Sequence, residues 1–303
     1  MHSILGKLKK LQLKARRHPE PTYHPAWPLC DEEISRPDME PQHGSPLFGT
    51  LSAELRIMIY RAVLTDASRF LHICLNRRDG VRRRVRSVAH YWCVDMESQF
   101  PKWQHTCYGE KFSPPGQEFR PITETDDKLL SLLLTCRIIY AEAMPILYRE
   151  NVFHFRGGPP LLAFRASISP RQWSSIRHIH ISSIHTKDSC MPGAEKKWPP
   201  EHIETWDRCF EILRGDKTLE TLRIDLMARF DMWGGGSAHN TELILMEALR
   251  KMRSIPAKFY EVEINIDPPQ EFWDALGEVD FAVIVRERQY NETLYYHPTS
   301  LQF

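Results

Sequence analysis

The sequence lacks several features that define large classes of protein. Its 303 residues contain no apolar run of the roughly 20 residues that a membrane-spanning helix needs, and the longest such run is Leu129–Cys136. The seven cysteines include no C-x-x-C pair, and their odd number and wide spacing indicate reduced thiols. Lysines interrupt the first residues, so no secretory signal is expected. These absences predict a cytoplasmic or nuclear protein with no transmembrane segment.

The sequence also lacks an excess of charge of either sign, and it lacks recognisable catalytic motifs. The 40 basic and 39 acidic residues give a formal net charge of +1, so overall charge points to neither a nucleic-acid nor a membrane partner. The sequence holds no nucleophile elbow, no H-E-x-x-H and no dinucleotide fingerprint, and Gly234–Gly236 lacks the lysine of a phosphate loop. We therefore expect a protein that is not an enzyme and needs no cofactor.

Both ends of the chain are predicted to be tails. Residues 1–46 begin with a basic stretch and continue as a proline-rich one, and proline favours an extended, disordered chain. A membrane-surface helix, a transit peptide and a nuclear signal are alternatives for the basic part. Residues 291–303 form the expected C-terminal tail, so the folded regions are predicted at 47–150 and 151–290.

A first amphipathic helix is predicted over residues 51–64. Leu51, Leu55 and Ile59 repeat at helical spacing, and Met58 and Val63 widen their stripe. Glu54 complements the helix dipole in the first turn. We expect this helix to be buried against a second helix, with part of its stripe available to a partner.

The second helix is predicted over residues 126–150. Apolar side chains cover nearly every face as far as Met144, so this helix should be buried on most sides. Pro145 is expected to end or kink it, because proline lacks the N–H donor that a helix interior needs.

Residues 65–125 are predicted to form a hairpin followed by a long loop. The β-rich stretches 70–75 and 85–94 flank Asp79-Gly80, a dipeptide that favours hairpin turns. Arginines crowd the stretch Arg77–Arg86. A solvated hairpin is the favoured interpretation, and a nucleic-acid-binding patch is the alternative.

A pattern of histidine and cysteine runs through the second half of this hairpin region. His90, Cys93, His105 and Cys107 are residue types that bind zinc, and four ligands suffice for a closed site. The single residue between His105 and Cys107 departs from common zinc-finger spacings. We therefore favour incidental polar groups and expect no metal.

Helices and short strands alternate after the second helix. This order predicts an α/β fold, α+β overall, with a mainly parallel sheet covered by helices. The irregular spacing of the strands indicates a short, degenerate relative of a leucine-rich repeat. Strands are predicted at 152–156, 177–181, 221–226 and 260–266, helices at 161–167, 201–214 and 241–253, and one more helix and strand at 272–276 and 281–287.

Two segments resemble the signatures of a known family. Residues 51–64 read LSAELRIMIYRAVL and resemble the opening of the F-box, although Ser52 stands at the position of the usual proline. Residues 132–155 resemble the second signature of a group of uncharacterised fungal F-box-like proteins. The residues that match this second signature are Leu134, Thr135, Cys136, Arg137, Tyr140, Glu142, Pro145, Leu147, Tyr148, Asn151, Phe153 and Phe155.

The resemblance implies both an architecture and a function. It implies an F-box-like helical unit at 47–150, with an insertion at 65–125, packed on an irregular leucine-rich-repeat-like sheet at 151–290. Such a unit binds the Skp-type adaptor of a cullin–RING ubiquitin ligase, and the region behind it captures a substrate. The second signature would be mainly structural, and the adaptor-facing residues would be Leu51, Glu54, Leu55 and Ile59.

Three hypotheses about function therefore remain open. The first is a protein–protein interaction module that acts as an F-box-type substrate receptor. The second is a nucleic-acid-associated regulator that uses Arg77–Arg86, although nucleic acid is the less favoured partner. The third is a structural domain with no link to a ligase.

Overall fold

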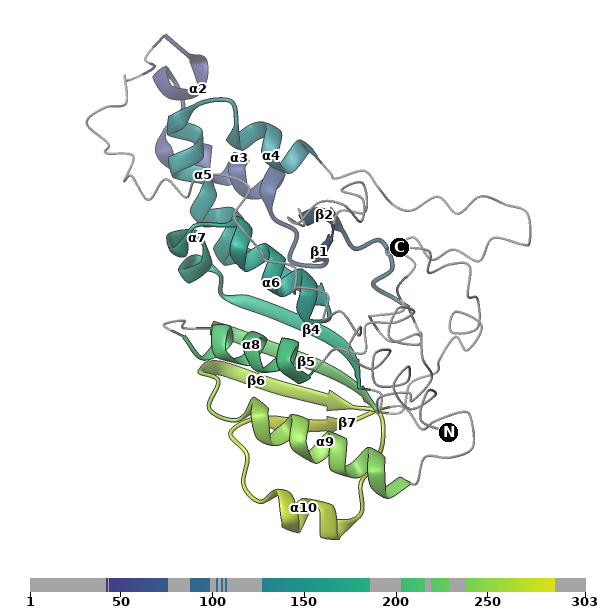
Figure 1. The fold of residues 1–303 in the computed structure, drawn as a ribbon. Helices are drawn as coiled ribbons and strands as arrows, with labels where there is room; N and C mark the ends of the chain where they lie inside the picture. The colour runs from purple at the N-terminus through teal and green to yellow at the C-terminus, as the bar shows by residue number, and fades with distance from the viewer. Residues whose placement is uncertain are drawn as a thin grey trace, which may run out of the picture.

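The computed structural model describes residues 44–75, 88–98, 127–185, 203–215, 219–228 and 238–286, and the single residues 42, 102, 105 and 107. Within these residues, helices and a seven-stranded, mostly parallel sheet confirm the expected α/β fold (Figure 1). Most of the N-terminal tail, Arg77–Arg86, Gly234–Gly236 and the C-terminal tail lie outside the described residues.

The strands of the sheet follow one another in nearly the order of the chain. Neighbouring strands are β2 (Val88–Trp92), β1 (Phe70–Leu75), β3 (Val152–Arg156), β4 (His178–His185), β5 (Leu219–Ala228), β6 (Ala257–Ile264) and β7 (Ala282–Val285). From β3 onward each strand is added in parallel beside the preceding one, as in a repeat protein. The predicted hairpin strands β1 and β2 do pair antiparallel, and β1 also pairs in parallel with β3, so they extend the same sheet.

The helices between the strands stack against one another in chain order. Figure 1 shows α8 and α9 lying over the same side of the strands β4 to β7. Contacts join α6 to α8, α8 to α9 and α9 to α10. These connecting helices are α6 (Gly158–Ser167), α7 (Pro170–Ser175), α8 (Ile203–Arg214), α9 (Ala238–Met252) and α10 (Gln270–Leu276).

Helix α7 was not predicted from the sequence because it is only six residues long. Ser169 begins it with a capping box, in which its hydroxyl accepts from the Gln172 amide and the Gln172 side chain accepts from the Ser169 N–H. The C-terminal additions, by contrast, were predicted, and they are α10 and β7.

The hydrophobic core lies between the sheet and its helices. In β3, Phe153 and Phe155 contact Phe164 of α6, whereas His154 between them points to the opposite face. The strand register aligns His72, His154 and His180 side by side on that opposite face. All three histidines are buried, so the sheet has an apolar inner face and a polar, covered outer face.

Four helices form a separate group at one end of the sheet (Figure 1). They are α2 (Pro46–Gly49), α3 (Ala53–Leu64), α4 (Asp127–Leu133) and α5 (Arg137–Glu150), and both α3 and α4 pack on α5. The two predicted helices thus do contact each other across the long separation in sequence. One hydrophobic core runs from this group into the sheet.

The prediction of one continuous helix from residue 126 to Pro145 was wrong in two respects. The chain leaves the helix after Leu133, because Thr135 Oγ1 donates to the Leu132 carbonyl at 2.6 Å and Cys136 Sγ accepts from the Ile139 amide at 3.5 Å. Pro145 neither ends α5 nor begins a new helix, since α5 continues to Glu150. The three residues after Pro145 are buried, and their packing outweighs the single lost backbone hydrogen bond.

Candidate functional site

One side of α3 presents a row of apolar side chains to solvent. Leu55, Met58, Ile59 and Val63, here called the α3 stripe, are 47%, 63%, 41% and 45% exposed. Their spacing of three, four and eight residues after Leu55 places them on one face of the helix. An exposed apolar row of this kind indicates a surface that binds another molecule.

The opposite side of α3 is held firmly on α5. Tyr60 and Leu64 are fully buried there. Arg56 makes a bidentate pair with Glu142, with Nε to Oε2 at 3.0 Å and Nη2 to Oε1 at 2.7 Å, and the Tyr60 hydroxyl donates to the same carboxylate at 3.1 Å. Burial, followed by the Glu142 carboxylate, raises the pKa of Tyr60 to about 12. The α3 stripe is therefore fixed in its outward orientation.

The predicted adaptor residues divide between surface and interior. Leu55 and Ile59 belong to the α3 stripe, and Glu54 is exposed in the first turn, beyond the N-cap residue Ser52. Leu51 is half-buried, and its carbonyl accepts from Arg56 Nη1 at 2.9 Å. The helix is buried against α5 on one face, as expected, but all four side chains of the stripe are exposed rather than only part of it.

The second signature connects the helical group to the sheet. Asn151 Nδ2 donates to the carbonyls of Leu64 at 2.8 Å and Leu147 at 2.9 Å, which joins the end of α3 to the end of α5. Tyr148 stacks on Phe153 with ring centroids 5.7 Å apart. These contacts let α3, α5 and β3 pack as one unit.

Other members of the second signature act at helix ends or lie on the surface. Tyr140 accepts from Gln172 of α7 at 2.9 Å, and Cys136 caps α5. Arg137, at the first position of α5, is exposed. The signature therefore contributes folding contacts rather than a cluster of reactive groups.

Helix α4 adds exposed apolar side chains at the same end of the molecule. Leu130 of α4 and Leu134, which directly follows it, are 43% and 77% exposed, whereas Leu129 and Leu133 are buried. The prediction that this segment is buried on most sides was wrong here, because among the described residues α4 packs along one side only.

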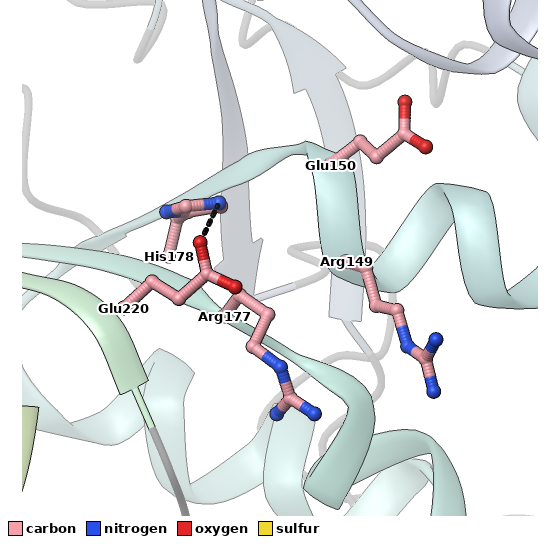
Figure 2. A pocket seen from close by; sticks show the side chains of 5 residues that line it. All are labelled: Arg149, Glu150, Arg177, His178 and Glu220. Atoms are coloured by element: carbon pink, nitrogen blue, oxygen red, sulfur yellow. Dashed lines mark ion pairs between the residues drawn. The ribbon is translucent and has the colours of Figure 1, made fainter.

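An open hollow of ≈ 520 Å³ lies at the amino ends of β4 and β5 and is lined by Arg149, Glu150, Arg177, His178 and Glu220. Figure 2 shows Glu220 pointing toward His178, 4.0 Å away, while Arg149 and Glu150 point apart. Glu150 pairs with Arg61 of α3 at 2.9 Å. Glu150 thus forms an ion pair within the fold, and Glu220 lies at the limit of such a pair with His178.

The outer face of the sheet buries a cluster of charged groups that sequence reasoning missed. Asp225 lies 2.9 Å from His180 Nε2 and 3.2 Å from Lys102 Nζ, and Arg223 Nη2 donates to Glu263 at 2.7 Å. Burial alone would raise the pKa of Asp225, but His180, Lys102 and Arg223 hold it well below its usual range. The acidic residues inside apolar strands were the available signal, but the sequence does not show what faces them.

Comparison with known proteins assigns the chain to a family without assigning a function. Residues 40–276 match the model of a domain of unknown function, DUF7730, and the chain therefore belongs to that family. No curated protein and no solved structure matches it. Among the helices of the described residues, none is long and apolar enough to span a membrane.

Proposed function

We propose that this protein is a non-enzymatic protein–protein interaction module of the cytoplasm or nucleus. Its α3 stripe would bind a Skp-type adaptor of a cullin–RING ubiquitin ligase, and the sheet region behind it would capture a substrate. The observation that carries the proposal is the exposure of Leu55, Met58, Ile59 and Val63 on the helix that resembles the F-box opening.

Energetics support an intermolecular role for the α3 stripe. Each of these side chains is about half exposed, so covering it would contribute about 1 kcal/mol of apolar transfer free energy. The Arg56–Glu142 pair keeps the row in place before binding, which reduces the entropy lost on association. The α3 stripe is short, so we expect the partner to contact it with a flat helical surface rather than a deep groove.

Contact between the two helices that carry the F-box-like signatures also supports the proposal. Residues 65–126 separate α3 from α4 in the sequence, yet α3 and α5 remain in contact through Glu142 and Asn151. The α3 stripe therefore lies on one continuous helix despite the insertion, as the proposed adaptor binding needs.

Binding to a purified Skp-type adaptor tests this proposal directly. The intact protein should bind at micromolar concentration or below in isothermal titration calorimetry. Ile59→Asp and Met58→Asp should each weaken binding about tenfold or more, because each places a charge in the apolar contact.

Leu243→Asp is the matched control, since Leu243 is 50% exposed on the distant helix α9. It should leave adaptor binding unchanged. Absence of binding by the intact protein, or equal effects of all three variants, would sink the ligase version of the proposal.

A further inference from the structure

Four potential metal ligands converge at the edge of the sheet formed by β1 and β2. His72 lies on β1, Cys93 directly follows β2, and His105 and Cys107 come from the segment beyond it. One ligand atom from each side chain lies within 4.8 Å of all the others. All four side chains are buried.

The pairing of β1 with β2 explains how these residues meet. His72 lies opposite Tyr91, and the Cys93 amide donates to the Phe70 carbonyl at 2.8 Å, so Cys93 continues the face that carries His72. His90 pairs with Ile73 and points to the other face. The zinc pattern considered in the sequence thus contained one wrong residue, because His72 takes the place of His90.

Two distances within the cluster match those of a tetrahedral zinc site. Cys93 Sγ lies 3.7 Å from Cys107 Sγ and 3.4 Å from His105 Nδ1. A tetrahedron with Zn–S bonds of about 2.3 Å and Zn–N bonds of about 2.0 Å separates two sulfurs by about 3.8 Å and a sulfur from a nitrogen by about 3.5 Å. The two sulfurs are also much too far apart for a disulfide, which has a bond of about 2.05 Å.

Neighbouring polar groups orient the ligands. His72 Nδ1 lies 2.9 Å from His154 Nδ1, and His154 Nε2 lies 2.8 Å from Ser182 Oγ. When His72 Nδ1–H donates to His154 and His154 Nε2–H donates to Ser182, both contacts are satisfied and His72 Nε2 carries the lone pair that a metal ion would accept.

The Cys107 sulfur also has the surroundings of a zinc thiolate. It accepts from the Val94 amide at 3.3 Å, a contact that stabilises negative charge on sulfur. The cluster therefore combines a preformed shape with hydrogen-bonded ligands.

We propose that His72, Cys93, His105 and Cys107 bind one zinc ion. Two thiolates and two imidazoles complete four-coordination with no position left for water, which defines a structural rather than a catalytic site. The ion would fasten the segment carrying Lys102, His105 and Cys107 over the outer face of the sheet. This role is independent of adaptor binding by α3.

The test is the metal content of the full chain, expressed in zinc-supplemented medium and purified without a polyhistidine tag or chelator. Inductively coupled plasma mass spectrometry should find about one zinc ion per chain. Cys93→Ser and Cys107→Ser should lower that content about tenfold or more. The matched variants are His72→Asn and His90→Asn, and only the first should lose zinc.

Cobalt provides a readout that does not depend on the variants folding. After removal of zinc from the unaltered chain, Co²⁺ should produce the visible bands of a tetrahedral thiolate site and a charge-transfer band in the near ultraviolet. Zinc should then displace the cobalt and raise the melting temperature.

Several outcomes would overturn the proposal. They are a chain that takes up neither zinc nor cobalt, stoichiometric iron in place of zinc, a disulfide between Cys93 and Cys107 in freshly purified protein, and equal zinc loss in the His72→Asn and His90→Asn variants.

Discussion

The helical group exposes apolar side chains to solvent, whereas the outer face of the sheet buries polar ones. In the helical group, Met58 and Leu134 lie exposed to solvent. On the outer face of the sheet, His154, His180 and Asp225 are buried. Polar groups remain buried only when they are paired, and these three have partners within 3.0 Å. The difference separates a surface suited to binding from an interior stabilised by polar contacts.

The largest expected effect contrasts two adjacent leucines of the helical group. Leu133 is 3% exposed and Leu134 is 77% exposed. Leu133→Asp should destabilise the fold by about 4 kcal/mol or more, because it buries an unpaired carboxylate. Leu134→Asp should change stability by about 0.5 kcal/mol or less. Thermal unfolding of both variants measures the contrast, and similar melting temperatures would contradict the exposure of α4.

Asp225→Asn should produce the next largest effect, on the outer face of the sheet. The change removes the carboxylate that Lys102 and Arg223 share and leaves their charges partly buried. We expect a loss of about 3 kcal/mol in the free energy of unfolding, measured with urea. Asp267→Asn is the control, since Asp267 is exposed, and it should be close to neutral. A neutral Asp225→Asn would mean that the outer face is open to water.

Stability should also depend on the protonation of His180. Burial is the main cause that lowers the pKa of His180 to about 4. The charge of Asp225 acts to raise this pKa, whereas the charges of Lys102 and Arg223 lower it further. The pKa of a histidine in the unfolded chain is about 6.5. Below that pH the unfolded chain binds a proton at His180, whereas the folded protein does not. The contribution of neutral His180 is therefore present above pH 6.5 and falls by on the order of 2–3 kcal/mol as the pH drops toward 4.

Urea unfolding across this pH range measures the effect. His180→Asn removes the titrating group, so its stability should fall less steeply between pH 6.5 and 4 than that of the unaltered chain. The groups that face His180 are Asp225, Lys102, Arg223 and the neutral His154. Parallel pH curves for the two proteins would contradict the assignment.

The smallest effect compares two ion pairs of α3. The Arg56–Glu142 pair is mostly buried, whereas Arg61 and Glu150 are largely in solvent. Arg56→Ala should cost about 2 kcal/mol, because it removes both hydrogen bonds that Arg56 donates to the part-buried Glu142 carboxylate. Arg61→Ala should cost well under 1 kcal/mol, since exposed pairs contribute little. Equal costs in a urea titration would indicate that α3 does not lie against α5 as described.

Much of the fold was predictable because local patterns carry it. The prediction for 152–156 coincides with β3, and the other predicted strands and helices of the β/α region overlap β4 to β7, α6 and α8 to α10, whereas α7 was missed. Hydrophobic periodicity and chain order determine these elements, and alternation of helix with strand determines the parallel sheet. The break after Leu133 was missed because it depends on two side-chain contacts with the backbone.

The candidate sites were less predictable, because each depends on what lies across space. Helical spacing identified the stripe of α3 but not which side α5 would cover. The sequence analysis interpreted His90, Cys93, His105 and Cys107 as incidental polar groups, and His90 lies on the other face of the sheet from the cluster. His72 precedes Cys93 by 21 positions, and only the pairing of β1 with β2 brings them together.

By itself, the sequence determined where helices and strands form and that they build an α/β fold, because side-chain periodicity and capping act over a few residues. The tertiary structure alone decided that Leu134 is exposed while Leu133 is buried, and that His72 joins two cysteines and a histidine. Exposure and ligand geometry belong to surfaces that distant segments create together. The packing of those segments determines both the exposure and the ligand geometry, and a local pattern of residues does not predict that packing.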